Sequence, residues 1–387
     1  MKCKVHSKMG LRTVIVTLIV AAAIFFGFNE SKAKSARRQI SIVDASGRSV
    51  TVPASPRHVI CSGPGCLRYL TYLQAHHTVA AVDDIETKRQ RFDARPYALA
   101  NPQLKSCPIF GQFRGYDSPE LIAALDPQPQ IIFKTFGSSG HDPIELQQKT
   151  GIPVIVLNYG DLTANREAMY ASLRTMGKVM GKTDRAETVI GFFNSTIEDL
   201  EKRTDGLPDI RRRSCYVGGI AYRGPHGFQS TEPGYPPFLF TRSRNVVAEP
   251  EQGQKALSHA TVAKEKIMEW DPEVLFVDLS TLQSDARFNA ILELQKDLAY
   301  RQLNAVKTGE VYGVLPYNWY AQNYGSTLAD AYFVGKVLYP ERFTDIDPVK
   351  QADKIFSFLV GRPVFDQMNA AFDSKIFQRL ALQELGK

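Results

Sequence analysis

Two glutamates occupy equivalent places in a pattern that the chain repeats. Glu120 begins Glu-Leu-Ile-Ala-Ala-Leu-Asp-Pro, and Glu265 begins Glu-Lys-Ile-Met-Glu-Trp-Asp-Pro. In each copy the apolar spacing, the proline and the apolar run that follows predict a short amphipathic helix and then a buried strand. A carboxylate near a helix start is favoured by the helix dipole. The repeat indicates two similar α/β lobes or a coincidence between two helix-strand units.

Patterns for catalysis or metal binding are weak by comparison. Gly63-Pro64-Gly65 follows an apolar run, but the proline lacks an N–H and no complete phosphate-binding glycine pattern follows. The sequence has no Gly-x-Ser-x-Gly elbow, no Cys-x-x-Cys and no paired-histidine motif. We therefore expect no enzyme, no catalytic residues, no protein-bound metal and no cofactor. A secreted hydrolase is the least favoured alternative.

The N-terminus predicts export. Lys2, Lys4, Lys8 and Arg12 precede an apolar stretch over residues 13–28, and small residues surround Ala33. This layout is typical of a signal peptide over residues 1–33, removed near Ala33, and it predicts a periplasmic protein. The alternative is an uncleaved anchor, but the run lies at the lower limit of the roughly 17–25 residues that span a membrane.

The basic charge of the chain lies mostly in this targeting segment. The formal net charge is +7, and residues 1–33 hold five basic residues and one acidic residue, which leaves +3 for the remainder. The charge of the exported part therefore gives little support for nucleic acid as a partner.

Beyond the signal, strands alternate with helices and predict an α/β fold with central, mostly parallel sheets. We expect an N-terminal α/β lobe over residues 34–162, a linking helical region over 163–204 and a C-terminal α/β lobe over 205–350. A helical tail is expected over 351–387. The linking region has no strand signal, and its apolar residues recur at helical spacing.

Three cysteines, Cys61, Cys66 and Cys107, fall in the N-terminal lobe, and Cys215 falls in the C-terminal lobe. An oxidising compartment permits a disulfide, but the four cysteines that remain when residues 1–33, with Cys3, are removed do not form a disulfide framework in a chain of this length. Whether the first three include one bridge is left open, and the cysteines are interpreted as structural.

Several of these elements, in this order, resemble a known family. The chain is similar to the periplasmic substrate-binding proteins of ABC importers for iron chelates and cobalamin, over nearly all of residues 40–360. The resemblance is carried by the hairpin with Asp44, Gly47 and Val52-Pro53, the strand and turn at Val59 to Pro64, Ala81 to Asp84, Tyr116 to Phe133, Ala263 to Val277 and Leu338 to Phe343.

The resemblance implies two lobes joined by a single long helical linker, with the ligand in a cleft between them. It implies that Glu120 and Glu265 dock onto an ABC permease, which works with an ATPase. We expect a monomer that binds a small-molecule metal chelate and no nucleic acid. The implied ligand is an iron chelate such as a siderophore. The alternatives are a free metal ion or a cobalamin-like cofactor.

Loops at the strand ends that face the other lobe should form the cleft. They are residues 62–66, 112–116 and 134–139 in the N-terminal lobe, and 222–228, 278–282 and 317–323 in the C-terminal lobe. Rings and cations in these loops suit a flat or anionic chelate, because rings stack and guanidinium groups pair with carboxylates. The predicted ligand-binding residues are Arg114, Tyr116, Lys134, Tyr222, Arg223, His226, Tyr317, Trp319 and Tyr320.

Overall fold

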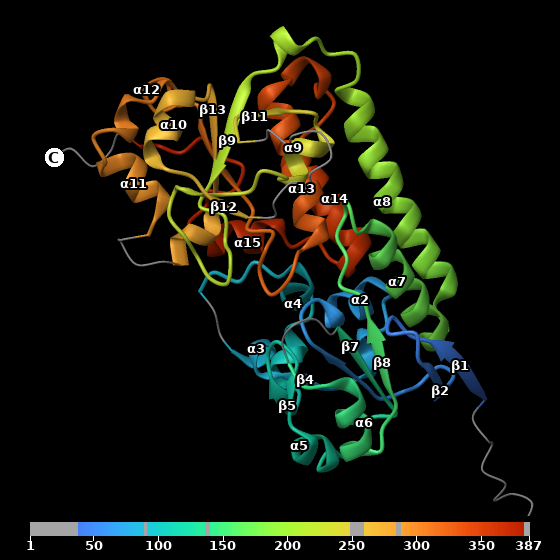
Figure 1. Ribbon diagram of the computed structural model, residues 1–387. Coiled ribbons are helices and arrows are strands. Elements are labelled where there is room, and N and C mark those ends of the chain that lie inside the picture. Colours follow the sequence, from blue (N-terminus) through green and yellow to red (C-terminus); the bar gives the residue numbers. More distant parts are fainter. Residues whose placement is uncertain (1–37, 89–90, 136–139, 248–258, 284–287, 383–387) are drawn as a thin grey trace, which may run out of the picture.

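The computed structural model describes residues 38–88, 91–135, 140–247, 259–283 and 288–382. The predicted signal peptide, residues 1–33, lies outside the described residues. Two α/β lobes lie one above the other in Figure 1, with a long helix along one side of both. This arrangement confirms the predicted fold class.

The N-terminal lobe is built on a six-stranded sheet of order β6-β5-β4-β3-β7-β8, parallel except for the edge strand β6. Its apolar strands β3, β7 and β8 are buried along their whole length, as expected for parallel strands covered on both faces. The bounds are β3 (Val59–Ser62), β4 (Val79–Asp83), β5 (Ile109–Gln112), β6 (Tyr116–Asp117), β7 (Ile131–Thr135) and β8 (Val154–Leu157). Its helices are α2 (Cys66–Tyr72), α3 (Asp84–Thr87), α4 (Pro96–Ala100), α5 (Pro119–Ala123) and α6 (Pro143–Thr150).

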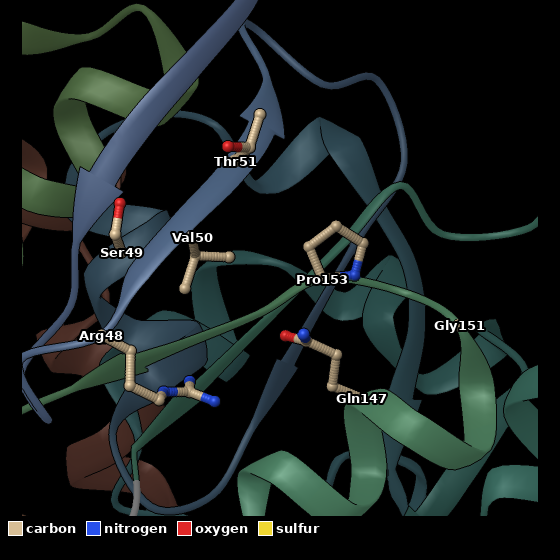
Figure 2. Close-up of a pocket in the computed structure, with 7 residues that line it drawn as sticks. All are labelled: Arg48, Ser49, Val50, Thr51, Gln147, Gly151 and Pro153. Atoms are coloured by element: carbon tan, nitrogen blue, oxygen red, sulfur yellow. The ribbon is translucent and has the colours of Figure 1, made fainter.

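The predicted hairpin is confirmed as β1 (Gln39–Val43) and β2 (Ser49–Pro53), and its turn covers the outer edge of β8. The Ala45 N–H donates to the Val156 carbonyl (3.0 Å), and the Arg48 guanidinium donates to the Val154 carbonyl (2.9 Å). A small hollow of about 230 Å³ lies between β2 and α6 (Figure 2). Arg48 and Gln147 line it, and both are hydrogen-bonded to the backbone of Val154. They therefore satisfy backbone groups of the edge strand β8.

The C-terminal lobe has a four-stranded parallel sheet of order β11-β9-β13-β14. Its central strand β13 follows the second copy of the repeat, as β7 follows the first. The strands are β9 (Ser214–Gly218), β11 (Arg244–Asn245), β13 (Val274–Asp278) and β14 (Val311–Val314), with a separate short pair of β10 (Ser230–Thr231) and β12 (Ala260–Thr261). The helices are α9 (Pro236–Phe240), α10 (Lys264–Trp270), α11 (Ala290–Lys296), α12 (Asn304–Thr308) and α13 (Tyr324–Leu338). Short 3-10 helices occur in both lobes. Those of the N-terminal lobe are η1 (His76–Thr78) and η2 (Pro102–Ser106), and the others are η3 (Asp209–Arg211), η4 (Leu279–Gln283), η5 (Tyr300–Gln302) and η6 (Pro340–Arg342).

Two helices connect the lobes: α7 (Arg166–Met180) and the 21-residue α8 (Thr183–Arg203). The helical prediction for this region is confirmed. At 1.5 Å per residue α8 is about 30 Å long, enough to pass along both lobes, as the green helix does in Figure 1. Its buried residues have the spacing of one helix face: Ala186, Val189, Ile190, Phe193, Thr196, Ile197 and Leu200.

The C-terminal tail forms α14 (Pro348–Val360) and α15 (Phe365–Ala371), and it braces both lobes. Helix α14 packs on α13 and also on α2 and α4 of the N-terminal lobe. Arg185 of α8 donates to the Tyr72 carbonyl of α2 (2.9 Å) and to the Phe358 carbonyl of α14. One apolar core therefore continues from lobe to lobe through the helices, which indicates a stiff connection.

The cysteines among the described residues form no disulfide. Cys61, Cys66, Cys107 and Cys215 are all free. Cys66 is fully buried and its thiol donates to the Phe133 carbonyl (3.4 Å), so it packs as part of the core.

Candidate functional site

A cavity of about 740 Å³ lies between the lobes. Its walls follow β3, β4 and β5 of one sheet and β9 and β14 of the other, so it is bounded by the carboxyl ends of strands, where open α/β sheets bind ligands. The lining residues are Pro64, Ile85, Lys88, Phe113, Arg114 and Tyr116 from the N-terminal lobe, and Ala221, Tyr222, Arg223, Gly224, Asn318, Trp319, Tyr320 and Ala321 from the C-terminal lobe.

The N-terminal wall combines two aromatic rings, Phe113 and Tyr116, with two cations. The Arg114 guanidinium lies 5.0 Å from the centre of the Phe113 ring, and the Lys88 ammonium lies 5.5 Å from it. Lys88 also pairs with Asp84 (2.7 Å). The Phe113 ring meets Tyr320 of the other lobe edge to face, with centroids 6.0 Å apart. The wall is therefore cationic and offers ring surface to a ligand.

The C-terminal wall is shaped by a loop that two histidines support. The Tyr222 ring stacks on His259 with centroids 4.3 Å apart, and the Arg223 guanidinium lies 5.6 Å from the Tyr222 ring centre. The His226 Nε2 is 2.7 Å from the Tyr222 carbonyl. His226 holds the loop and does not line the cavity, while Tyr222 and Arg223 stay exposed at its edge.

Tyr320 ties the two lobes together. Its hydroxyl donates to Asp83 at the end of β4 and accepts the backbone N–H of Arg114 (3.2 Å). Further along the same loop, the Gln322 N–H donates to the Tyr159 hydroxyl (2.9 Å). The loop thus forms one wall of the cavity and also part of the contact between the lobes.

Lys134 does not reach the cavity, contrary to its predicted role in ligand contact. Its side chain is fully buried, because β7 is a central strand. The ammonium forms an ion pair with Asp117 and donates to Ser62 Oγ (3.1 Å) and to the Gly115 carbonyl (2.9 Å). An ammonium has three donors, and all of them are used here, so Lys134 holds the base of the N-terminal wall.

Tyr317 also lies beneath the cavity surface. Its ring is 1% exposed and its hydroxyl donates to buried Glu232. The structure therefore brings six of the nine predicted ligand-binding residues to the cavity, and Lys134, His226 and Tyr317 are not part of its lining. Those that line it are Arg114, Tyr116, Tyr222, Arg223, Trp319 and Tyr320. Their contact with a ligand stays a prediction.

Two cavity residues lie outside all the predicted loops of the N-terminal lobe. Ile85 and Lys88 belong to the segment that directly follows β4. The signal that could have found them is the strand over 79–83, because the carboxyl ends of neighbouring parallel strands meet at one edge. The C-terminal lobe adds Ala221, one position before a predicted loop.

Two buried carboxyl groups pair with the tyrosines of this loop. Burial, together with the nearby Glu86, raises the pKa of Asp83 to about 8, although Tyr320 hydrogen-bonds to it. Burial raises the pKa of Glu232 to about 8 against the hydrogen bond from Tyr317. In the folded protein both groups hold their protons well above their ordinary pKa values of 3.8 and 4.5.

We expect the protein to lose stability as the pH rises from about 5 to about 8, because in this window the folded state binds more protons than the unfolded state. Asp83→Asn and Glu232→Gln should each flatten this dependence, since each replaces the carboxyl with a neutral amide. Thermal unfolding of the parent and of each variant, followed across this pH range, measures the dependence of stability on pH. Asp209→Asn, at a 96% exposed side chain, is the control and should keep the parent slope. A slope unchanged in all three variants would contradict the prediction.

The two repeated glutamates lie away from the cavity. Glu120 is the second residue of α5 and Glu265 the second residue of α10, and both are exposed. Helices α5 and α10 lie at opposite ends of the molecule in Figure 1, one in each lobe. The Glu120 backbone N–H and the Ser118 hydroxyl (3.0 Å) lower the pKa of Glu120. Each lobe therefore presents one carboxylate at an equivalent helix start.

The comparisons with known proteins agree with a two-lobe binding protein. A sequence model of the family described as periplasmic binding protein matches residues 74–317, and the chain belongs to that family. The chain is similar to a periplasmic solute-binding protein of Veillonella parvula, with a TM-score of 0.66, 16% identity and coverage of 88% of this chain and 98% of that one.

It is also similar to the molybdate-binding protein MolA of Haemophilus influenzae (TM-score 0.63, 18% identity, 84% of this chain and 98% of that one). The petrobactin-binding protein YclQ of Bacillus subtilis gives a TM-score of 0.53 at 17% identity, over 79% of this chain and 99% of that one. No curated protein matches the sequence. Among the residues that the structure describes, no helix has both the length and the apolar character needed to span a membrane.

Proposed function

We propose that this protein is the periplasmic solute-binding component of an ABC importer and that it captures an anionic metal chelate, with iron as the metal. The observation that carries the proposal is the lining of the cavity between the lobes. Its described lining side chains include the cations Lys88, Arg114 and Arg223 and no carboxylate. Rings from both lobes accompany these cations, so the site suits a ligand with anionic oxygens and flat surfaces.

The cavity is large for a bare ion, and its chemistry differs from that of an ion site. A volume of about 740 Å³ lies within the range of small-molecule sites. A site for a free transition metal needs three or four converging His, Cys, Asp or Glu side chains. The described part of the chain contains no such group, and the rings and guanidinium groups at the cavity favour a complex that arrives already chelated.

Delivery to a permease is the second part of the proposal. Glu120 and Glu265 are exposed at matching helix starts, one on each lobe, and neither lines the cavity. A carboxylate pair of this kind can meet two arginine pockets on a membrane partner and fix its orientation. The ligand would be bound non-covalently, and the partner ATPase would supply the energy for transport.

Native mass spectrometry of the protein purified from its own periplasm tests the ligand. We expect a retained mass that contains iron and an organic chelator, because a cavity lined from both lobes should release its ligand slowly. Titration of ligand-free protein with ferric citrate and with molybdate follows as the matched comparison. Retention of molybdate, or binding of molybdate but not of any ferric chelate, would contradict the iron-chelate proposal.

A further inference from the structure

Arg68 of α2 is a buried arginine whose guanidinium is only partly used by the fold. It is 1% exposed, and its Nε and Nη1 have no hydrogen-bond partner among the described residues. The nearby carboxylate of Glu86 is already bonded to Arg95 (2.9 Å) and to Tyr97 (2.6 Å). Unsatisfied buried donors destabilise a protein, and those in native structures require an explanation.

The guanidinium lies directly behind the cavity wall. Its Nη2 donates to the carbonyl oxygens of Tyr320 (3.1 Å) and Ala321 (3.5 Å), two residues that line the cavity. On the other side is Gly65, where an added Cβ would be 3.3 Å from Arg68 Nη1 and 3.4 Å from the Ala321 Cβ. The unused donors therefore sit at the junction between α2 of one lobe and the cavity loop of the other.

The two residues that cover Arg68 have a strained backbone. Tyr320 has φ 44° and Ala321 has φ 77°, in the left-handed region that residues with a Cβ rarely adopt. Consecutive residues of this kind persist only where the surroundings hold them, and they concentrate at ligand clamps and switches. Here the Tyr320 hydroxyl is held by Asp83 and its carbonyl by Arg68.

We propose that Arg68 is an anion subsite at the inner end of the cleft, which a ligand reaches when its anionic oxygens replace the Tyr320 and Ala321 carbonyls on the guanidinium. The proposal rests on the proposed function, because it takes the cleft as the ligand site. The planar guanidinium fork suits a carboxylate or another oxyanion of the ligand, held by two parallel hydrogen bonds. Pairing would satisfy the buried donors and release the strain in the covering loop.

The test uses the ring of Trp319, which lines the cavity, as a fluorescent reporter. The chain has two tryptophans, so Trp270→Phe leaves a single reporter. In this background we compare the parent with Arg68→Met, which removes the charge at similar length, and Arg68→Lys, which keeps the charge but not the planar fork. The probes are ferric citrate and citrate alone as anions, and a neutral ferric trihydroxamate.

We expect Arg68→Met to weaken binding of the anionic probes at least roughly 10- to 100-fold, because one of the two charge-assisted hydrogen bonds alone accounts for that loss. Arg68→Lys should lie between. The neutral complex should bind parent and variant within about twofold. The melting temperature of the ligand-free Arg68→Met protein should stay close to that of the parent, because removal of a buried, under-used charge offsets the loss of the bonds to the Tyr320 and Ala321 carbonyls. An arginine with a purely structural role would give a clear fall.

Three outcomes would overturn the proposal. If Arg68→Met binds the anionic probes like the parent, Arg68 is not a subsite, and the proposed function stands. If the parent binds only the neutral complex, the cleft takes an uncharged iron chelate. The subsite then fails together with the anionic character of the proposed ligand, while the role in iron-chelate import stands. If no probe, anionic or neutral, changes the Trp319 fluorescence of the parent, the subsite fails together with the iron-chelate function.

Discussion

Uptake should fall to the level of cells that lack the protein when Glu120 and Glu265 are both replaced by alanine. Each single replacement should reduce uptake at limiting ligand, and the pair should cost more than either alone, because each lobe contributes one carboxylate to docking. The ligand affinity of the purified double variant should stay within about twofold of the parent, since neither side chain lines the cavity. Uptake of labelled ligand by whole cells measures the first effect, and titration of pure protein measures the second.

Exposed glutamates on neighbouring positions provide the controls. Glu145 pairs with Lys149 on α6, and Glu269 pairs with Lys266 on α10, with half or more of each glutamate side chain exposed. Glu145→Ala and Glu269→Ala should leave uptake unchanged, and high salt should weaken permease association of the parent if long-range attraction contributes. Normal uptake by the double variant would leave both glutamates as groups that only stabilise their own helix starts.

Trp319→Ala should weaken ligand binding by about 1–3 kcal/mol, the usual loss for a central aromatic contact. Trp319 lines the cavity, and its indole Nε1 is buried with no partner among the described residues. Trp319→Phe keeps a ring and should recover most of the affinity. Isothermal titration with a ferric chelate that binds the parent measures the loss. Equal affinity of parent and Trp319→Ala would show that the indole packs the lobe and does not contact the ligand.

Tyr320 should respond differently to two replacements, because its ring and its hydroxyl have separate roles. Tyr320→Phe keeps the ring at the cavity but leaves buried Asp83 without its hydrogen bond, so we expect a loss of about 1–3 kcal/mol in the free energy of unfolding with near-parent affinity. Tyr320→Ala should lose both stability and affinity. Denaturant unfolding and ligand titration separate the two effects. An affinity loss in Tyr320→Phe as large as in Tyr320→Ala would assign ligand contact to the hydroxyl.

Local patterns predicted most of the elements. Each of these elements has its signal in consecutive residues. Examples are the continuous apolar runs that form β7 and β13, the hairpin at the start of the N-terminal lobe and the helices over 166–203. Their formation depends on backbone preference and on burial of one face or stripe, which periodicity reveals. The two glutamates at helix starts were visible for the same reason, since capping and the helix dipole act within one turn.

The candidate cleft was only partly visible, because its contacts join residues far apart in the chain. Lys134 looked available after an apolar run, yet β7 is central in its sheet and the ammonium is fully enclosed. Tyr317 and Tyr320 look alike in the sequence, but one turns into its own lobe towards Glu232 and the other crosses to Asp83. The order of the strands and the contact between the lobes determine which groups these three side chains bond to. The spacing of residues along the chain does not reveal those partners.

The amino-acid order was therefore sufficient for the α/β fold class and the two lobes, because periodicity, turns and repeated motifs are local. The class of binding protein came from the resemblance of these motifs, in their order, to a known family. The tertiary structure alone brought Lys88 beside Phe113, buried Arg68 behind the cavity loop and placed strained Tyr320 between the lobes. The first of these features arises between neighbouring strand ends of one sheet, and the other two arise where the two lobes meet. There the burial of each charged group depends on the surface of the other lobe, so its effect on binding follows from packing in three dimensions.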